Sequence, residues 1–156
     1  MAIDHAAYDA AMKRLEPFIG EWSIEADFPG APPPGDIGAR TTFEWILDRR
    51  FLLQRSEVPV EEAPNGHIVV GFDAAGGGYT QHYFDSRGVV RVYAMTFEDG
   101  VWTLLRDKPD FTPLDFHQRF EGEFSEDGDV MSGRWESSAD GSTWELDFHL
   151  KYTRVG

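Results

Sequence analysis

Ten segments with the character of β-strands follow one another along most of the 156 residues. Within each segment apolar and polar residues alternate, which is typical of a strand with one buried and one solvated face. No segment long enough for a helix separates them, and several connections carry Asp-Gly pairs that favour tight turns. The predicted strands lie near residues 20–28, 39–47, 50–58, 66–73, 79–85, 89–97, 101–106, 116–124, 129–137 and 143–153.

The strand order predicts the fold class. Parallel neighbours need a long crossover connection, usually a helix, so strands joined by short turns are expected to pair as an antiparallel meander. A meander of about ten strands is expected to close on itself, because closure removes exposed strand edges. We therefore predict an all-β chain, an up-and-down antiparallel barrel formed by residues 20–153 within a single domain that spans residues 1–156.

A short helix is expected before the barrel. Residues 3–16 are rich in alanine, and Pro17 ends the segment because its ring is incompatible with a helix interior. Ala7, Ala11 and Leu15 form only a narrow apolar stripe. We therefore expect the helix to plug one end of the barrel.

The charge and composition exclude several classes of partner. The chain has a formal net charge of -14 and no cysteine. This charge repels nucleic acid and anionic lipid, and the lack of cysteine excludes disulfides and thiolate chemistry. No apolar run reaches the length of a membrane span, and the N-terminal segment has no apolar signal sequence. We therefore expect a cytoplasmic protein, and its oligomeric state stays open.

Connection lengths distinguish the two ends of the predicted barrel. Alternate connections of a meander fall at alternate ends. The three long connections, residues 29–38, 59–65 and 107–115, share one end, and the tight turns and the helix share the other. Loops on a rigid scaffold often carry binding residues, so the binding site is expected at the long-loop end.

A Gly-x-Trp motif, Gly20-Glu21-Trp22, stands at the junction of the helix and the first strand, and Arg154 lies in the last strand. With this combination the chain resembles the calycin superfamily, the lipocalins and fatty-acid-binding proteins. In that superfamily an arginine from the last strand packs across the Trp ring, which is a favourable cation–π contact. The resemblance implies that Gly20, Trp22 and Arg154 are structural and that the barrel holds a small hydrophobic ligand.

Three further stretches extend the resemblance over nearly the whole chain. Residues 43–47, 81–88 and 140–145 are similar to an uncharacterised bacterial family of calycin-like barrels. That family implies the same fold and brings no established activity.

Alternation from an inward-facing Trp22 predicts which side chains point into the barrel. A barrel of this size has more interior than its side chains usually fill, so a cavity is expected.

Three arginines are also predicted to point inward near the long loops. Either Glu57 and Asp85 or the acid group of a ligand must neutralise them, because burying an unpaired guanidinium is costly. The candidate ligand-binding residues are Arg55, Arg91, Arg106, Gln118, Tyr93, Trp45, Phe51 and Phe120. Leu47, Leu53, Leu146 and Phe148 are also predicted to point inward.

We therefore expect the barrel to bind a small hydrophobic molecule with an acidic end. Two alternatives stay open. The first is a filled barrel that acts as a structural or interaction module. The second is a haem-binding barrel, because the nitrobindins share this architecture and use a single axial histidine near the chain end. His149 is the nearest match by position, although its alternation with Phe148 and Leu150 turns it outward.

Motifs for catalysis or metal binding are not recognisable. The five histidines form no close-spaced pair, and no Ser-His-Asp context, phosphate loop or nucleophile elbow is present. We expect no catalytic residue and no metal site, and no cofactor unless the haem alternative holds.

Overall fold

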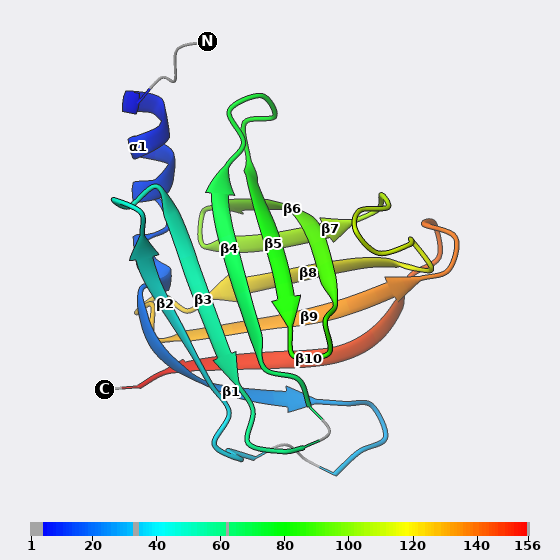
Figure 1. The fold of residues 1–156 in the computed structure, drawn as a ribbon. Coiled ribbons are helices and arrows are strands. Elements are labelled where there is room, and N and C mark those ends of the chain that lie inside the picture. Colours follow the sequence, from blue (N-terminus) through cyan, green and yellow to red (C-terminus); the bar gives the residue numbers. More distant parts are fainter. Residues whose placement is uncertain (1–4, 33–34, 62, 156) are drawn as a thin grey trace.

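A computed structural model describes residues 5–32, 35–61 and 63–155. They form a short N-terminal helix and ten antiparallel strands that close into one barrel (Figure 1). Each strand pairs with its neighbours in sequence, and the first strand pairs with the last. The predicted all-β antiparallel barrel is therefore confirmed.

The elements begin and end close to their predicted positions, and no strand boundary differs by more than two residues. The elements are α1 (His5–Lys13), the 3-10 helix η1 (Glu16–Phe18), β1 (Gly20–Asp27), β2 (Arg40–Ile46), β3 (Phe51–Glu57), β4 (Gly66–Phe72), β5 (Tyr79–Asp85), β6 (Val90–Glu98), β7 (Val101–Arg106), β8 (His117–Phe124), β9 (Val130–Ser138) and β10 (Glu145–Arg154).

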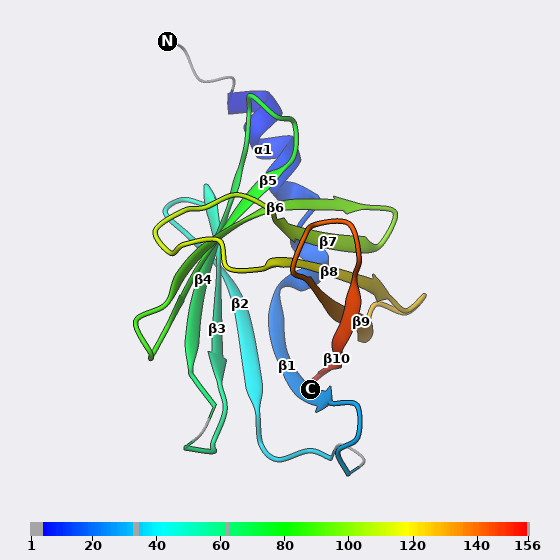
Figure 2. The same cartoon turned by 90° about the vertical axis from the view of Figure 1, so that its right-hand side faces the viewer.

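The two ends of the barrel differ as the connection lengths predict. Figure 2 shows the long β1–β2 and β3–β4 connections at the end opposite α1. The helix is shorter than expected, because it ends at Lys13 and a separate 3-10 turn contains Pro17. Residues 3 and 4 of the predicted helix lie outside the described residues. Within the described part of the chain, no helix has the length and apolar character needed to cross a membrane.

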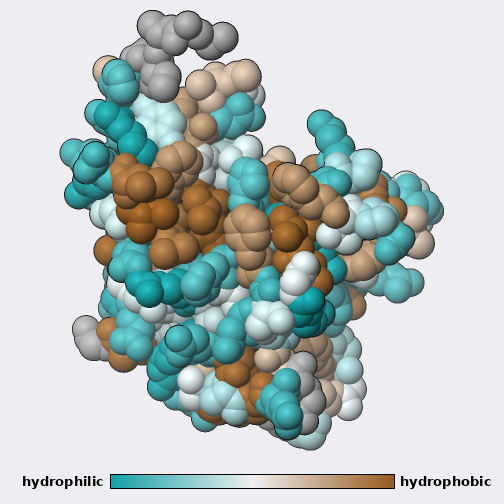
Figure 3. All heavy atoms as spheres, in the orientation of Figure 1, coloured by the Kyte–Doolittle hydropathy of each residue, from teal (hydrophilic) through white to brown (hydrophobic). Residues whose placement is uncertain are grey.

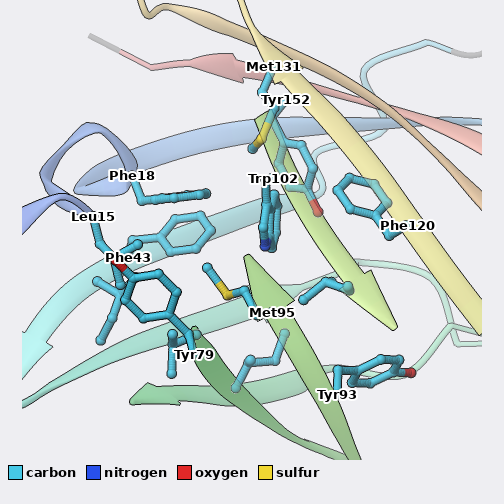
Figure 4. Close-up of a cluster of buried hydrophobic side chains, with 14 of the residues drawn as sticks. Leu15, Phe18, Phe43, Tyr79, Tyr93, Met95, Trp102, Phe120, Met131 and Tyr152 are labelled. Atoms are coloured by element: carbon cyan, nitrogen blue, oxygen red, sulfur yellow. The ribbon is translucent and has the colours of Figure 1, made fainter. Parts of the chain in front are cut away.

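Phe18 fills the helix end of the barrel. Its fully buried ring packs edge-on or tilted against Phe43, Phe97, Trp102 and Phe124, with ring centroids 4.9 to 5.3 Å apart. Figure 4 shows Phe18 beside Leu15 and Phe43, with Trp102 at the centre of the cluster. The plug predicted for the helical leader is therefore formed mainly by the turn that follows the helix.

The prediction for the faces of β3 is wrong. Strand pairing sets Trp45 opposite Leu52, so both point inward, and Gln54 follows on the same face. Phe51, Leu53 and Arg55 therefore lie on the outer face. The residues of β3 are apolar on both faces near its start, so alternation alone does not decide which face is buried.

Two leucines predicted to lie inside also lie elsewhere. Leu47 is 70% exposed, in a turn where Leu47, Asp48 and Arg49 all have positive φ. Leu146 is 43% exposed, because a register shift between Leu146 and Phe148 changes the face of β10. Phe148 beyond this bulge is half-buried and stacks on Phe28, with ring centroids 4.7 Å apart.

Candidate functional site

Polar side chains occupy the inner face of the barrel toward the long-loop end. At the helix end the interior is apolar, where Trp102 is 3% exposed and Met131 is fully buried. Toward the long loops, the inner-face residues Arg91, Gln118 and Trp135 are half-buried, whereas Tyr93 and Arg106 are buried. The polar groups gathered among aromatic rings make the long-loop end the candidate site.

Five side chains form what we call the mouth cluster. Strand pairing places Arg91 of β6 beside Tyr83 of β5 on the inner face. Tyr93 follows Arg91 on the same face of β6, and its ring lies 5.7 Å from that of Trp135. The mouth cluster consists of Tyr83, Arg91, Tyr93, Gln118 and Trp135.

Arg91 is the cation of the mouth cluster. Its Nη1 donates to Gln118 Oε1 over 3.5 Å, and its guanidinium lies 5.7 Å from the Phe116 ring centroid. Its Nε is buried and has no hydrogen-bond partner. Among the residues that the structure describes, no carboxylate lies within 4.0 Å of this guanidinium. The positive charge of Arg91 is therefore not neutralised by a direct ion pair.

Tyr93 and Gln118 orient each other beside Arg91. Tyr93 Oη donates to Gln118 Oε1 over 3.0 Å. Burial raises the pKa of Tyr93, so the phenol keeps its proton and remains a donor at neutral pH. Gln118 Oε1 thus accepts from two donors, which holds the amide in one orientation at the mouth.

Arg106 also points inward, but it already has a partner. Its side chain is 1% exposed, and its Nε and Nη2 donate to the two carboxylate oxygens of Asp110 over 2.9 and 3.0 Å. Nη2 also donates to the carbonyl of Thr112. The hydrogen bonds from Arg106 hold the pKa of Asp110 well below its usual range. Arg106 therefore braces the loop after β7, and Asp110 was missed as its partner although it follows four residues later.

Asp85 and Glu57 do not neutralise the inward arginines. Asp85 accepts hydrogen bonds from Tyr83 Oη over 2.7 Å and from Arg87 Nη2 over 2.6 Å. Glu57 is exposed at the end of β3. Arg55 is exposed on the outer face, where it pairs with Glu44. Of the three arginines predicted to converge at the mouth, Arg91 and Arg106 point inward and Arg55 does not. Arg106 pairs with Asp110, so of these two Arg91 is the one without a carboxylate partner among the described residues.

Two further polar atoms inside the barrel have no hydrogen-bond partner. They are Gln81 Oε1 on β5 and Trp102 Nε1 on β7. By contrast, the buried side chain of Gln54 on β3 donates from Nε2 to Thr41 Oγ1 over 3.0 Å. An unsatisfied buried polar group costs ~1–3 kcal/mol, so these atoms favour a water or ligand inside the barrel.

The aromatic residues predicted to form the floor divide between three places. Phe120 is inside and buried, packed against Trp102 and Trp135. Trp45 packs against the core at the helix end, with the Arg49 guanidinium 4.9 Å from its ring centroid. Phe51 is outside. Of the three predicted floor residues, Phe120 therefore contacts the mouth cluster, through Trp135.

Histidines do not point into the barrel. His149 is exposed on the outer face, paired in register with Arg134 and Asp27. His67 is exposed, and strand pairing places His82 and His117 on outer faces as well. These positions do not fit an axial ligand to a haem held inside the barrel. The described residues contain no group of three or more His, Cys, Asp or Glu side chains that could hold a metal ion.

Comparisons with known proteins support the fold alone. No protein-family model matches the chain, and no curated protein sequence matches it. Among solved structures, the chain is similar to Rv2717c from M. tuberculosis, with a TM-score of 0.62 and 15% sequence identity. The likeness covers 94% of this chain and 98% of that chain. The two proteins therefore share the barrel architecture over almost their whole length.

Proposed function

We propose that the barrel binds a small hydrophobic molecule with an acidic end, and that Arg91 receives the acid. The observation that carries this proposal is the unneutralised guanidinium of Arg91 on the inner face, with its buried Nε lacking a partner. A carboxylate is the group that best compensates such a charge, since it accepts two hydrogen bonds from one guanidinium.

The side chains that line the mouth can contact the hydrophobic part of the ligand. Tyr83, Tyr93, Trp135 and Phe148 present aromatic surface on the inner faces of their strands. Ligand pockets typically combine apolar walls with a few polar groups that set orientation. Trp102 Nε1 and Gln81 Oε1, deeper in the barrel, supply one free donor and one free acceptor for a polar substituent or a bound water.

The rim of the long-loop end supports entry of an apolar molecule. Phe28 is 48% exposed, Ile37 56% and Phe111 78%, and they lie after β1, before β2 and after β7. Large hydrophobic side chains exposed on the loops at this end are typical of a ligand-binding surface.

We also propose that the chain is a calycin-like barrel, because Gly20, Trp22 and Arg154 combine as in that superfamily.

A matched pair of probes tests the proposal. A fluorescent long-chain fatty acid and its methyl ester differ only in charge at the head. Replacing Arg91 with Gln should weaken binding of the acid by ~1.5–3 kcal/mol, roughly ten- to a hundredfold, and leave the ester unchanged. Arg55→Gln is the control, because that guanidinium lies on the outer face beside Glu44.

Other outcomes point elsewhere. Equal losses for acid and ester would mean that Arg91 shapes the mouth without contacting the head group. If the parent protein binds neither probe, the filled-barrel interaction module becomes the better description. The packing of Phe18 at the helix end is the observation that favours that second candidate.

A further inference from the structure

Two buried side chains, Gln81 of β5 and Trp102 of β7, each keep one polar atom without a partner inside the barrel. Both residues are 3% exposed. Among the residues that the structure describes, Gln81 Oε1 accepts no hydrogen bond and Trp102 Nε1 donates none. Figure 3 shows hydrophilic residues over much of the outer surface, where solvent satisfies their polar groups. Solvent at the surface does not reach these two buried atoms, so each needs a partner inside the barrel.

Strand pairing places Gln81 directly below the mouth cluster. Gln81 is paired in register with Tyr93 of β6, and Tyr83 is the next inner-face residue along β5. Arg91 is paired with Tyr83, so Gln81 lies two residues deeper in the barrel than Arg91, roughly 7 Å along the strand direction. On its other side Gln81 is paired with Val70 of β4, which is buried. The amide therefore lies between an apolar wall and the Tyr93 side chain.

Trp102 is connected to the mouth cluster through one ring. Its indole packs edge-on against Phe120, with ring centroids 4.9 Å apart, and Phe120 packs against Trp135 of the mouth cluster over 5.2 Å. In Figure 4 the indole nitrogen of Trp102 points away from Met131 and toward the side of the barrel that carries Met95. Met95 belongs to β6, the strand that pairs with β5. The unpartnered N–H of Trp102 is therefore directed toward the half of the interior that contains Gln81.

Other buried polar side chains of the interior have partners within the chain. Gln54 Nε2 donates to Thr41 Oγ1, and Arg106 donates to both carboxylate oxygens of Asp110. The fold thus provides partners for buried polar groups elsewhere. An unpaired acceptor and an unpaired donor in the same part of the barrel therefore indicate a group that the chain itself does not supply.

We propose that the ligand is a hydrophobic hydroxy acid, with its carboxylate at Arg91 and its hydroxyl at Gln81 and Trp102. A hydroxyl both donates and accepts, so it can donate to Gln81 Oε1 and accept from Trp102 Nε1. A ketone or an ether only accepts and would leave Gln81 Oε1 unsatisfied. The separation of Arg91 and Gln81 along the barrel requires several carbons between the acid and the hydroxyl. This inference rests on the proposed function, because it assumes that the acid lies at Arg91.

A water molecule has the same hydrogen-bonding capacity as a hydroxyl, so the experiment must separate the two. Stearic acid and a series of hydroxystearic acids, with the hydroxyl at successive carbons along the middle of the chain, compete with the fluorescent fatty acid for the parent protein. At least one hydroxy acid should bind about tenfold more tightly than stearic acid, because it satisfies two buried polar atoms.

Gln81→Met removes the acceptor and keeps a side chain of similar length. In this variant the preference for the hydroxy acid should fall to about threefold or less, while stearic acid keeps its affinity. Thr80→Val is the matched control, because Thr80 precedes Gln81 on β5 and lies on the outer face. It removes a hydroxyl from the same strand and should leave the preference unchanged.

Nuclear magnetic resonance observes the other half of the contact directly. The indole N–H signal of Trp102, assigned by its absence from Trp102→Phe, should move downfield with the preferred hydroxy acid and much less with stearic acid. This measurement uses the parent protein, so it does not depend on how well a core variant folds.

The outcomes distinguish this inference from the proposed function. If stearic acid and every hydroxy acid bind equally well, and Arg91→Gln weakens them all, the proposed function stands and the hydroxyl contact is wrong. A preference that survives in Gln81→Met, together with an unmoved Trp102 signal, also overturns the hydroxyl contact. If no acid binds, or if Arg91→Gln changes no affinity, the proposed function fails and this inference fails with it.

Discussion

The guanidinium of Arg154 lies over the indole ring of Trp22, with 4.2 Å between its central carbon and the ring centroid. The two residues are paired in register where the last strand meets the first. Arg154 Nη1 and Nη2 donate to the carbonyls of Ile19 and Pro17, each over 2.8 Å. One side chain therefore ties β10 to β1 and to the turn that plugs the barrel.

Removing this contact should destabilise barrel closure. Trp22 is fully buried, so Trp22→Ala is expected to lower the free energy of unfolding by ~3–5 kcal/mol. Arg154→Ala should lower it by less, because the guanidinium is partly solvated. Urea unfolding of both single variants and the double variant gives the coupling energy, which should be non-zero because the side chains touch. Additive losses would contradict the contact.

Gly133 of β9 should not tolerate a side chain. A Cβ there would lie 2.4 Å from the Phe120 ring and 2.9 Å from the Glu121 carbonyl oxygen. Gly133→Ala should therefore lower the free energy of unfolding by ~1–3 kcal/mol through overpacking. Gly35→Ala is the control, because nothing lies within 4 Å of its added Cβ. Urea unfolding measures the denaturant midpoint of each variant. Equal midpoints for Gly133→Ala and Gly35→Ala would show that the Phe120 ring moves aside easily.

Asp110 should matter for stability because it neutralises a buried cation. Asp110→Asn leaves the Arg106 guanidinium inside without a counter-charge, and we expect a loss of ~3–5 kcal/mol in the free energy of unfolding. The exposed pair of Arg55 and Glu44 offers a comparison, and Arg55→Gln should cost under about 1 kcal/mol. Thermal and urea unfolding of the two variants measure the difference. A small loss for Asp110→Asn would mean that water replaces the carboxylate.

Stability should fall in acid partly through Asp85. Burial alone would raise the pKa of Asp85, but hydrogen bonds from Arg87, Tyr83 and backbone N–H groups outweigh burial and lower it to about 2, from an ordinary 3.8. A carboxylate with a lowered folded-state pKa stabilises the protein above the unfolded-state pKa, and this stabilisation is lost as pH falls toward the folded-state pKa. The contribution of Asp85 is on the order of 2 kcal/mol near neutral pH.

Urea unfolding of the parent and of Asp85→Asn measures this contribution. The difference in unfolding free energy should be largest above about pH 5 and should shrink as pH falls from about 4 toward 2, since the parent carboxylate is then protonated in the unfolded chain. Asp48→Asn in the exposed β2–β3 turn is the control, because among the residues that the structure describes no cation lies within 4.0 Å of the Asp48 carboxylate. If the difference in unfolding free energy between the parent and Asp85→Asn stays constant down to acid pH, the effect of the substitution is steric.

The turn between β2 and β3 determines which face of β3 is buried. The two-residue turn at Asp48-Arg49 already sets Trp45 opposite Leu52, so an inward Trp45 requires an inward Leu52. Alternation that starts from an inward Phe51 predicts the opposite arrangement, in which Leu53 and Arg55 also point inward. The bulge that moves Leu146 outward has no comparable signal in the sequence, because one extra residue in a strand leaves the local pattern of residue types unchanged.

The sequence by itself determined the number, order and limits of the strands. Alternation and turn residues act over a few neighbours, so they can be read without knowing the rest of the chain. Only the tertiary structure decided that Asp110 folds back onto Arg106 while Arg91 keeps no carboxylate within reach. This outcome depends on where loops and strands distant in sequence meet, and the pairing register sets that.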